Sequence, residues 1–270
     1  MNVNQNPSRL DLSSTPTPAP AIPQVKARGR GVGSNASGRF EAFRRSGFDD
    51  GWHREDDDLP VLRTHVTEEA ARSIIARNVS PDISFDRSIN PYLGCEHGCI
   101  YCFARPTHAF LGLSPGLDFE SRLIARPDAS EVLERELRAK SYRPAVIAIG
   151  TNTDPYQPIE RDYRIMRRIL EGLRDYRHPV AVVTKGTLIE RDIDILGQMG
   201  RDGLARVGVS ITTLDPDVSR RMEPRVPSPV RRMKTIERLA QAGCPVHVMV
   251  SPVVPAVTDR EMESVSYTHL

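Results

Sequence analysis

Few cysteines, no long hydrophobic run and little net charge mark this sequence, and each absence removes a class of protein. Only four cysteines occur in 270 residues and three of them are clustered, so the dispersed framework of a secreted disulfide-bonded protein is excluded. No apolar run is long enough to span a bilayer. The N-terminus lacks the hydrophobic core of a signal peptide. We therefore expect a cytoplasmic protein without a membrane partner.

The near balance of charge leaves a nucleic-acid partner open. Lysine and arginine total 37, aspartate and glutamate total 35, and the formal net charge is +2. Such a chain argues neither for nor against a polyanionic partner. Hydrophobic residues make up 39% and charged residues 27%, which is ordinary for a folded globular protein.

The two ends of the chain differ from its middle. Residues 1–58 hold a proline-rich run, a basic glycine-rich stretch and an acidic stretch, with few apolar residues to offset the entropy of ordering. We expect a disordered N-terminal arm, favouring a solvated tail over an arm that docks on the domain or touches nucleic acid. Four aromatic residues keep the docking alternative open: Phe40, Phe43, Phe48 and Trp52. Residues 264–270 show neither helical spacing nor a cap, so we expect them to be foreign to a truncated chain.

Between these ends, residues 59–263 form the expected core, in which short apolar strands alternate with amphipathic helices. Thr67 is expected to cap a short helix. Strands are expected at 83–90, 145–150, 180–184, 207–211 and 246–250, with helices between them. This pattern predicts an α/β fold with a parallel sheet. Periodicity alone fits an open doubly wound sheet and part of a barrel equally well.

The loop after the first of these strands holds the clustered cysteines in the spacing C-x3-C-x2-C, as Cys95, Cys99 and Cys102. Three thiolates on a short loop can reach three corners of one cubane cluster. Gly94 and Gly98 allow the backbone to wrap closely around inorganic sulfide. Three ligands for four irons leave one iron open, and an open coordination site is where chemistry occurs.

Two other uses of these thiols remain as alternatives. A zinc-stabilised binding module would add His97 or Cys244 as fourth ligand, although structural zinc usually comes as paired knuckles and no second knuckle exists here. A non-catalytic iron–sulfur electron carrier would need Cys244 as a fourth thiolate. We expect Cys244 to be a small buried filler and both His97 and His108 to be ordinary loop residues.

With Tyr101 before the third cysteine, the pattern C-x3-C-x-aromatic-C resembles the fingerprint of the radical S-adenosylmethionine (SAM) superfamily. The resemblance implies a partial (β/α) TIM-like barrel, here truncated after the fifth strand. It implies a [4Fe–4S] cluster on Cys95, Cys99 and Cys102, with SAM on the open iron and Tyr101 lining the SAM pocket. An external one-electron reductant of the flavodoxin or ferredoxin type would drive SAM cleavage to a 5′-deoxyadenosyl radical, which abstracts hydrogen from an unknown substrate.

Three longer runs narrow the resemblance to the branch that contains spore photoproduct lyase and uncharacterised bacterial relatives: NPYLGCEHGC, TNTDPYQPIE and VTKG. By this resemblance, Lys185 and Ser210 at strand ends hold the SAM carboxylate. The superfamily often binds the SAM amino group with Gly-Gly-Glu after the second strand. This chain has Gly150–Asp154 there, so Thr151, Asn152 and Thr153 are the candidates, and Asp154 is an alternative shaper of the loop. DNA repair follows only by analogy.

A charged cluster follows the fourth strand, comprising Arg220, Arg221, Glu223 and Arg225. We expect it on an exposed, solvated loop. The alternative is that it faces a phosphate or another anionic substrate, which would suit a nucleic-acid partner.

Overall fold

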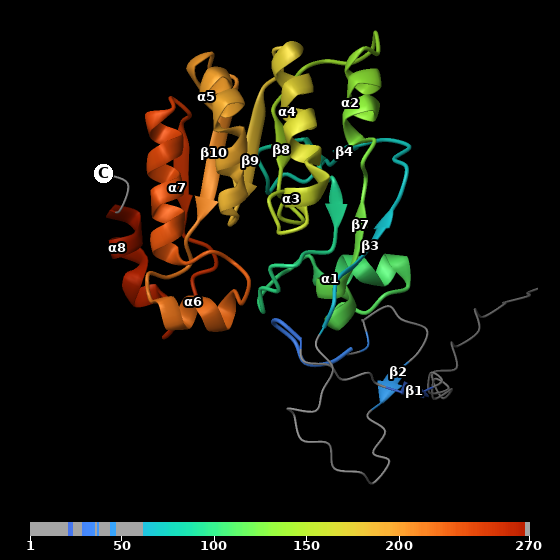
Figure 1. Cartoon of the computed structure of the whole chain (residues 1–270), viewed down its shortest axis with the longest axis vertical. Coiled ribbons are helices and arrows are strands. Elements are labelled where there is room, and N and C mark those ends of the chain that lie inside the picture. The colour runs from blue at the N-terminus through green and yellow to red at the C-terminus, as the bar shows by residue number, and fades with distance from the viewer. Residues whose placement is uncertain (1–20, 24–28, 36, 38–43, 47–61, 268–270) are drawn as a thin grey trace, which may run out of the picture.

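A computed structural model describes residues 21–23, 29–35, 37, 44–46 and 62–267 (Figure 1). Its centre is a six-stranded sheet in the order β11-β10-β9-β8-β5-β4. These strands are β4 (Ile75–Arg77), β5 (Arg87–Ile89), β8 (Ile147–Ile149), β9 (Val180–Thr184), β10 (Ala205–Ser210) and β11 (Val246–Met249). All neighbours from β5 to β11 pair in parallel, and β4 is antiparallel to β5. The predicted α/β fold with a parallel sheet is confirmed, and each of the five expected strands overlaps one parallel strand.

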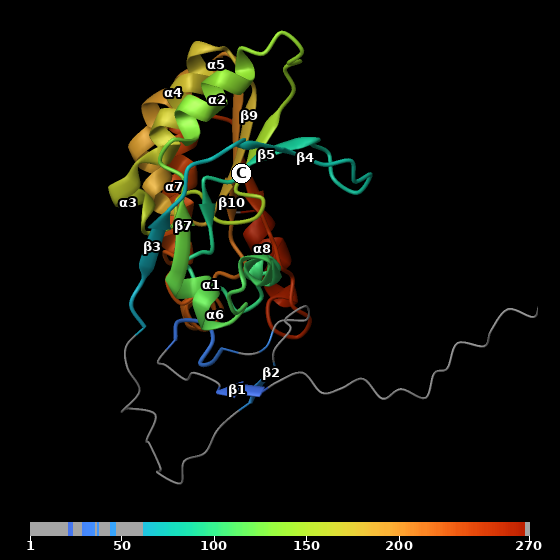
Figure 2. The same ribbon diagram turned by 90° about the vertical axis from the view of Figure 1, so that its right-hand side faces the viewer.

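Among the parallel strands of this sheet, each lies beside the one that comes before it in chain order. Helices connect successive strands. These helices are α2 (Ala129–Leu137), α3 (Glu160–Tyr163), α4 (Ile165–Asp175), η3 (Thr187–Asp192), α5 (Ile193–Arg201), α6 (Pro216–Met222) and α7 (Pro229–Gln241). Figure 2 places α2, α4, α5 and α7 on the same side of the sheet. A doubly wound sheet would reverse its strand order and carry helices on both faces. The sheet is therefore wound in one direction.

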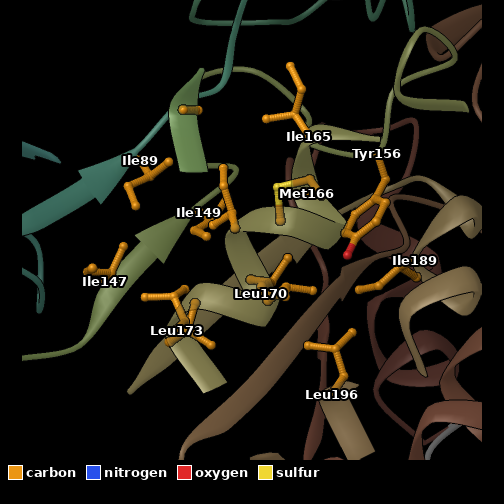
Figure 3. Packing of buried hydrophobic residues seen from close by; sticks show 14 of the residues in the cluster. Ile89, Ile147, Ile149, Tyr156, Ile165, Met166, Leu170, Leu173, Ile189 and Leu196 are labelled. Atoms are coloured by element: carbon orange, nitrogen blue, oxygen red, sulfur yellow. The ribbon is translucent and has the colours of Figure 1, made fainter. Parts of the chain in front are cut away.

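The main hydrophobic core fills the space between these helices and the sheet (Figure 3). Apolar side chains recur along α4 at the spacing of one helical face, so Met166, Leu170 and Leu173 all point into the core and are fully buried. Ile147 and Ile149 meet them from β8. The buried apolar face of α4 therefore packs this helix against the sheet.

A second, three-stranded sheet in the order β3-β7-β6 carries the start of the cysteine loop. Its strands are β3 (His65–Glu68), β6 (Tyr92–Leu93) and β7 (Arg122–Ala125), and the short helices η2 (Arg105–Leu111) and α1 (Leu117–Ser121) lie between β6 and β7. The prediction that Thr67 caps a helix is wrong, because Thr67 lies in β3 and pairs with Ile124 of β7. That pairing partner is distant in sequence, so the local pattern did not reveal it.

The described parts of the two ends are folded. Residues Met262–Tyr267 form α8 after η4 (Asp259–Glu261), and Val265 is fully buried. The helix thus takes in residues 264–267 of the tail that the sequence predicts to be foreign to the chain. Most of the expected disordered arm, residues 1–58, lies outside the described residues. Within it, β1 (Ala21–Pro23) pairs with β2 (Arg44–Ser46), and Gly29–Asn35 contacts the core.

In the described residues, no helix combines the length and apolar character needed to cross a membrane.

Two substitutions in α4 test this packing. Leu170→Ala should lower the free energy of unfolding by about 2–5 kcal/mol, because it leaves a cavity in the core. Gly172→Ala should raise it by about 0.5–1 kcal/mol, because nothing lies within 4 Å of the added Cβ and alanine favours the helix. Denaturant titration of both variants measures the two changes, and equal effects would contradict the assignment of the buried face.

Candidate functional site

The cysteine loop runs between β6 and η2, and glycine permits its conformation. Gly94 and Gly98 have φ angles of 79° and 67°, in the left-handed region that favours glycine. A Cβ on Gly94 would lie 2.6 Å from the Leu123 side chain and 2.9 Å from the Phe119 carbonyl oxygen. The sharp path of the loop therefore depends on glycine at these positions.

One pocket lies between this loop and the carboxyl ends of β8, β9 and β10. Among the residues that line it are seven of the sequence-predicted site residues: Cys95, Cys99, Tyr101, Cys102, Asn152, Lys185 and Ser210. Thr151 and Thr153 are not among its lining residues. The Thr153 hydroxyl donates instead to the carbonyl of Tyr92 in β6, at 2.7 Å. The fold thus brings most of the predicted site together at one edge of the sheet.

The three thiols in this pocket are unpaired and shielded from solvent. Cys95 and Cys99 are buried, Cys102 is half-buried, and none forms a disulfide. Burial raises the pKa of all three, that of Cys99 to about 12. They are therefore neutral at pH 7 in the absence of a metal. Binding of a positively charged metal centre would have to displace their protons.

The donor set fits a cluster with three protein ligands. In the described residues, no three His, Cys, Asp or Glu side chains converge on a point that could hold one ion. Ligands of a mononuclear zinc site surround one ion, whereas each thiolate of a cubane binds a different iron. Three thiols on one loop match the number of protein ligands that a cubane with one open iron needs.

Of the two alternative fourth ligands, Cys244 lies away from the pocket, whereas His97 lines it. Cys244 precedes β11 and so lies at the amino ends of the parallel strands, opposite the cysteine loop, where it is part of the main core. The Nδ1 atom of His97 lies 3.4 Å from Oδ2 of Asp154. His108 is fully buried, with Nε2 2.9 Å from the Arg122 carbonyl oxygen.

Asp154 connects the cysteine loop to β9. Its carboxylate faces His97 and accepts hydrogen bonds from the Thr184 hydroxyl at 2.6 Å and the Lys185 backbone N–H at 2.7 Å. Burial alone would raise the pKa of Asp154, but His97 and these donors lower it to about 2. The carboxylate is therefore ionised at neutral pH and orients the backbone of Lys185.

Gln157 was not predicted from the sequence and holds the first half of the cysteine loop. Its side chain is fully buried. The amide oxygen accepts from the Glu96 backbone N–H at 2.8 Å, and the amide nitrogen donates to the Gly94 carbonyl at 3.0 Å. Both bonds flank Cys95. The only sequence signal was an amide in the polar run after the second expected strand.

Glu223 lies behind Tyr101, in a fully buried ion pair with Arg232 at 2.7 Å. The expectation that Glu223 lies on an exposed loop is wrong. Tyr101 donates its hydroxyl to Glu223, and Thr212 donates to the same carboxylate at 2.9 Å. Arg232 also donates to the Ser210 carbonyl at 2.6 Å. Burial would raise the pKa of Glu223, but Arg232 and then Lys185 bring it below its usual value.

The other members of this charged cluster lie outside. Arg220 and Arg221 are exposed, as expected, but they lie in α6 rather than on a loop, and Arg225 pairs with the buried Glu96 at 2.9 Å. Lys185 differs from them, because it lines the pocket and forms no ion pair within the described part of the chain. Its ammonium lies 5.7 Å from the centre of the Tyr101 ring. The pocket therefore contains a positive charge available to an anionic group.

Glu223→Gln should lower the free energy of unfolding by about 3–5 kcal/mol, because it leaves the Arg232 guanidinium buried without a counter-charge. Glu237→Gln on the exposed face of α7 is the matched control and should stay within about 0.5 kcal/mol of the wild type. Thermal and denaturant unfolding measure both. A Glu223→Gln protein as stable as the control would show that the pair contributes nothing.

A family model described as the radical SAM superfamily matches residues 89–266. An uncharacterised protein of Mycobacterium tuberculosis is 40% identical over 177 residues, which cover 66% of this chain and 52% of that protein. An uncharacterised protein of Methanocaldococcus jannaschii is 26% identical over 174 residues, covering 64% of this chain and 62% of that protein. The chain thus spans about half the length of its mycobacterial relative.

Solved structures share the fold. Spore photoproduct lyase complexed with dinucleoside spore photoproduct matches with a TM-score of 0.54 at 18% identity, over 70% of this chain and 52% of that one. A variant of the same lyase with bound AdoMet and dinucleoside spore photoproduct gives a TM-score of 0.53 at 16% identity, over 78% and 59%. The family match over residues 89–266 takes in the cysteine loop and all the strands that build the pocket. This chain belongs to the radical SAM superfamily.

Proposed function

We propose that this protein is a radical SAM enzyme in which Cys95, Cys99 and Cys102 hold a [4Fe–4S] cluster. The observation that carries the proposal is a pocket lined by three unpaired thiols and by Lys185, a lysine that forms no ion pair with any other described residue. Three thiolates leave one iron open, and a cation beside it suits the carboxylate of SAM. When bound, the cluster supplies the electron that cleaves SAM reductively and starts hydrogen abstraction from a substrate.

The remaining pocket residues have distinct proposed roles in holding SAM. Lys185 and Ser210 bind the carboxylate, and Tyr101 lines the adenine side. Asn152 is the favoured partner of the SAM amino group, because it lines the pocket while Thr151 and Thr153 do not. The burial of Cys95 and Cys99 would limit the contact of a bound cluster with water.

We base the electron donor and the barrel architecture on membership of the family. An external one-electron reductant of the flavodoxin or ferredoxin type would serve the cluster. The one-directional sheet with helices on one side supports an incomplete (β/α) barrel. A cytoplasmic location suits free thiols.

Nucleic acid is the substrate class we propose to test first. The spore photoproduct lyase structures, similar in fold, contain a dinucleoside photoproduct. Phe103 is 78% exposed and lines the pocket, so its ring can stack on a base. DNA binding that weakens as salt rises would support this class, and indifference to DNA would remove it.

Cys99→Ala should abolish a stable cluster and SAM cleavage, because no other thiol of the described residues lies near enough to replace it. Cys244→Ala is the matched control and should retain both, since Cys244 lies at the opposite edge of the sheet. Each protein is reconstituted anaerobically with iron and sulfide and reduced with SAM present; 5′-deoxyadenosine is quantified by chromatography. An active Cys99→Ala variant defeats the assignment.

The same assay separates the alternatives. A brown protein whose reduced EPR spectrum does not change when SAM is added would be an electron carrier. A colourless protein that contains zinc would be a zinc-stabilised binding module.

Lys185→Met should keep the cluster but weaken SAM binding by about tenfold to a hundredfold, because a charge-assisted hydrogen bond is lost. Titration of the SAM-dependent change in the EPR spectrum measures the affinity. Unchanged affinity would exclude Lys185 as the carboxylate partner, while loss of iron from the variant would indicate a structural role.

A further inference from the structure

The segment Gly29–Asn35 belongs to the arm expected to be disordered, yet it lies against the cysteine loop. Its two ends are anchored to α1. Asn35 is buried, and its amide oxygen accepts from the Asp118 backbone N–H at 3.2 Å while its amide nitrogen lies 3.4 Å from Oδ1 of Asp118. The backbone N–H groups of Arg30 and Gly31 each donate to the Glu120 carboxylate at 3.1 Å.

Glu120 connects this segment to a cluster ligand. Its side chain is fully buried and forms an ion pair with Arg105 at 2.5 Å. The same guanidinium donates to the Cys99 carbonyl at 2.8 Å. Two side chains, those of Glu120 and Arg105, therefore link the backbone of Gly29–Asn35 to the backbone of Cys99.

Arg30 reaches the other half of the loop. Its side chain is 11% exposed and donates to the Thr64 hydroxyl at 2.5 Å, with Glu96 at 3.5 Å. Thr64 in turn donates to Glu96, which directly follows Cys95. Arg30 thus lies near Glu96, which follows Cys95, and against Gly98, which precedes Cys99.

Gly31 lies directly on the loop backbone. A Cβ on Gly31 would lie 1.8 Å from the Gly98 carbonyl oxygen and 3.1 Å from Glu120 Oε1. Gly98, between Cys95 and Cys99, is itself buried. Only a residue without a side chain can therefore pack here.

We propose that Gly29–Asn35 is a strap that completes the cluster site: it covers the outer side of the cysteine loop, holds Cys95 and Cys99 in place, and limits access of oxygen and chelators to the cluster. Arg30 and Gly31 act as positioning residues through Glu96, Glu120 and Gly98. The role of the strap toward the cluster rests on the proposed function, while its cover of the loop does not.

Gly31→Ala tests the strap, with Gly33→Ala as the matched control, because nothing lies within 4 Å of a Cβ on Gly33. Displacing the strap costs its hydrogen bonds to Glu120, which should raise the open population and the rate of cluster loss by about tenfold. The readout is the decay of the brown absorbance in air and in EDTA after anaerobic loading to equal iron content. Arg30→Ala is the second variant and should act in the same direction.

A second measurement does not need the cluster. In cluster-free protein, alkylation of Cys99 followed by mass spectrometry should be about tenfold faster in Gly31→Ala than in Gly33→Ala. Equal labelling and equal decay in the two variants overturn the strap. A wild type that takes up no cluster defeats the proposed function, and the labelling rates then still decide whether the strap covers the loop.

Discussion

The site depends on one constraint: an irregular loop with three thiols must keep its shape while its backbone is buried. Buried backbone groups need hydrogen-bond partners, and side chains from distant segments supply them. Gln157 bonds on both sides of Cys95, and Arg105 bonds to the carbonyl of Cys99. The loop is thereby held by groups that are themselves buried, which is how a site is kept in register before any cofactor binds.

Charge is distributed around this loop in a consistent way. Asp154, which lines the pocket, and the buried Glu223 are kept ionised by donors and by Arg232. They orient Lys185 and Tyr101, while no ion pair of the described residues occupies the Lys185 ammonium. The pocket therefore combines neutral thiols with the Lys185 cation, while Asp154 and Glu223 accept hydrogen bonds from other groups.

Much of the scaffold could be predicted from the sequence, because its signals are local. Continuous apolar strands and helical spacing predicted the five parallel strands and the helices between them, and the cysteine spacing located the loop. Thr67 was misassigned because its strand pairing with β7 is a long-range contact. Glu223 was misassigned because the charged residues around it suggested a solvated loop, whereas it is buried in an ion pair with Arg232 of α7.

The sequence by itself determined the family, the three thiols and the edge of the sheet where ligands gather, since each of these is written in spacing and periodicity along the chain. Only the tertiary structure decided which polar residues hold the loop. Gln157, Glu120 and the segment Gly29–Asn35 act through contacts across many residues of sequence. Such contacts depend on how strands and helices come together in space, and no local pattern encodes them.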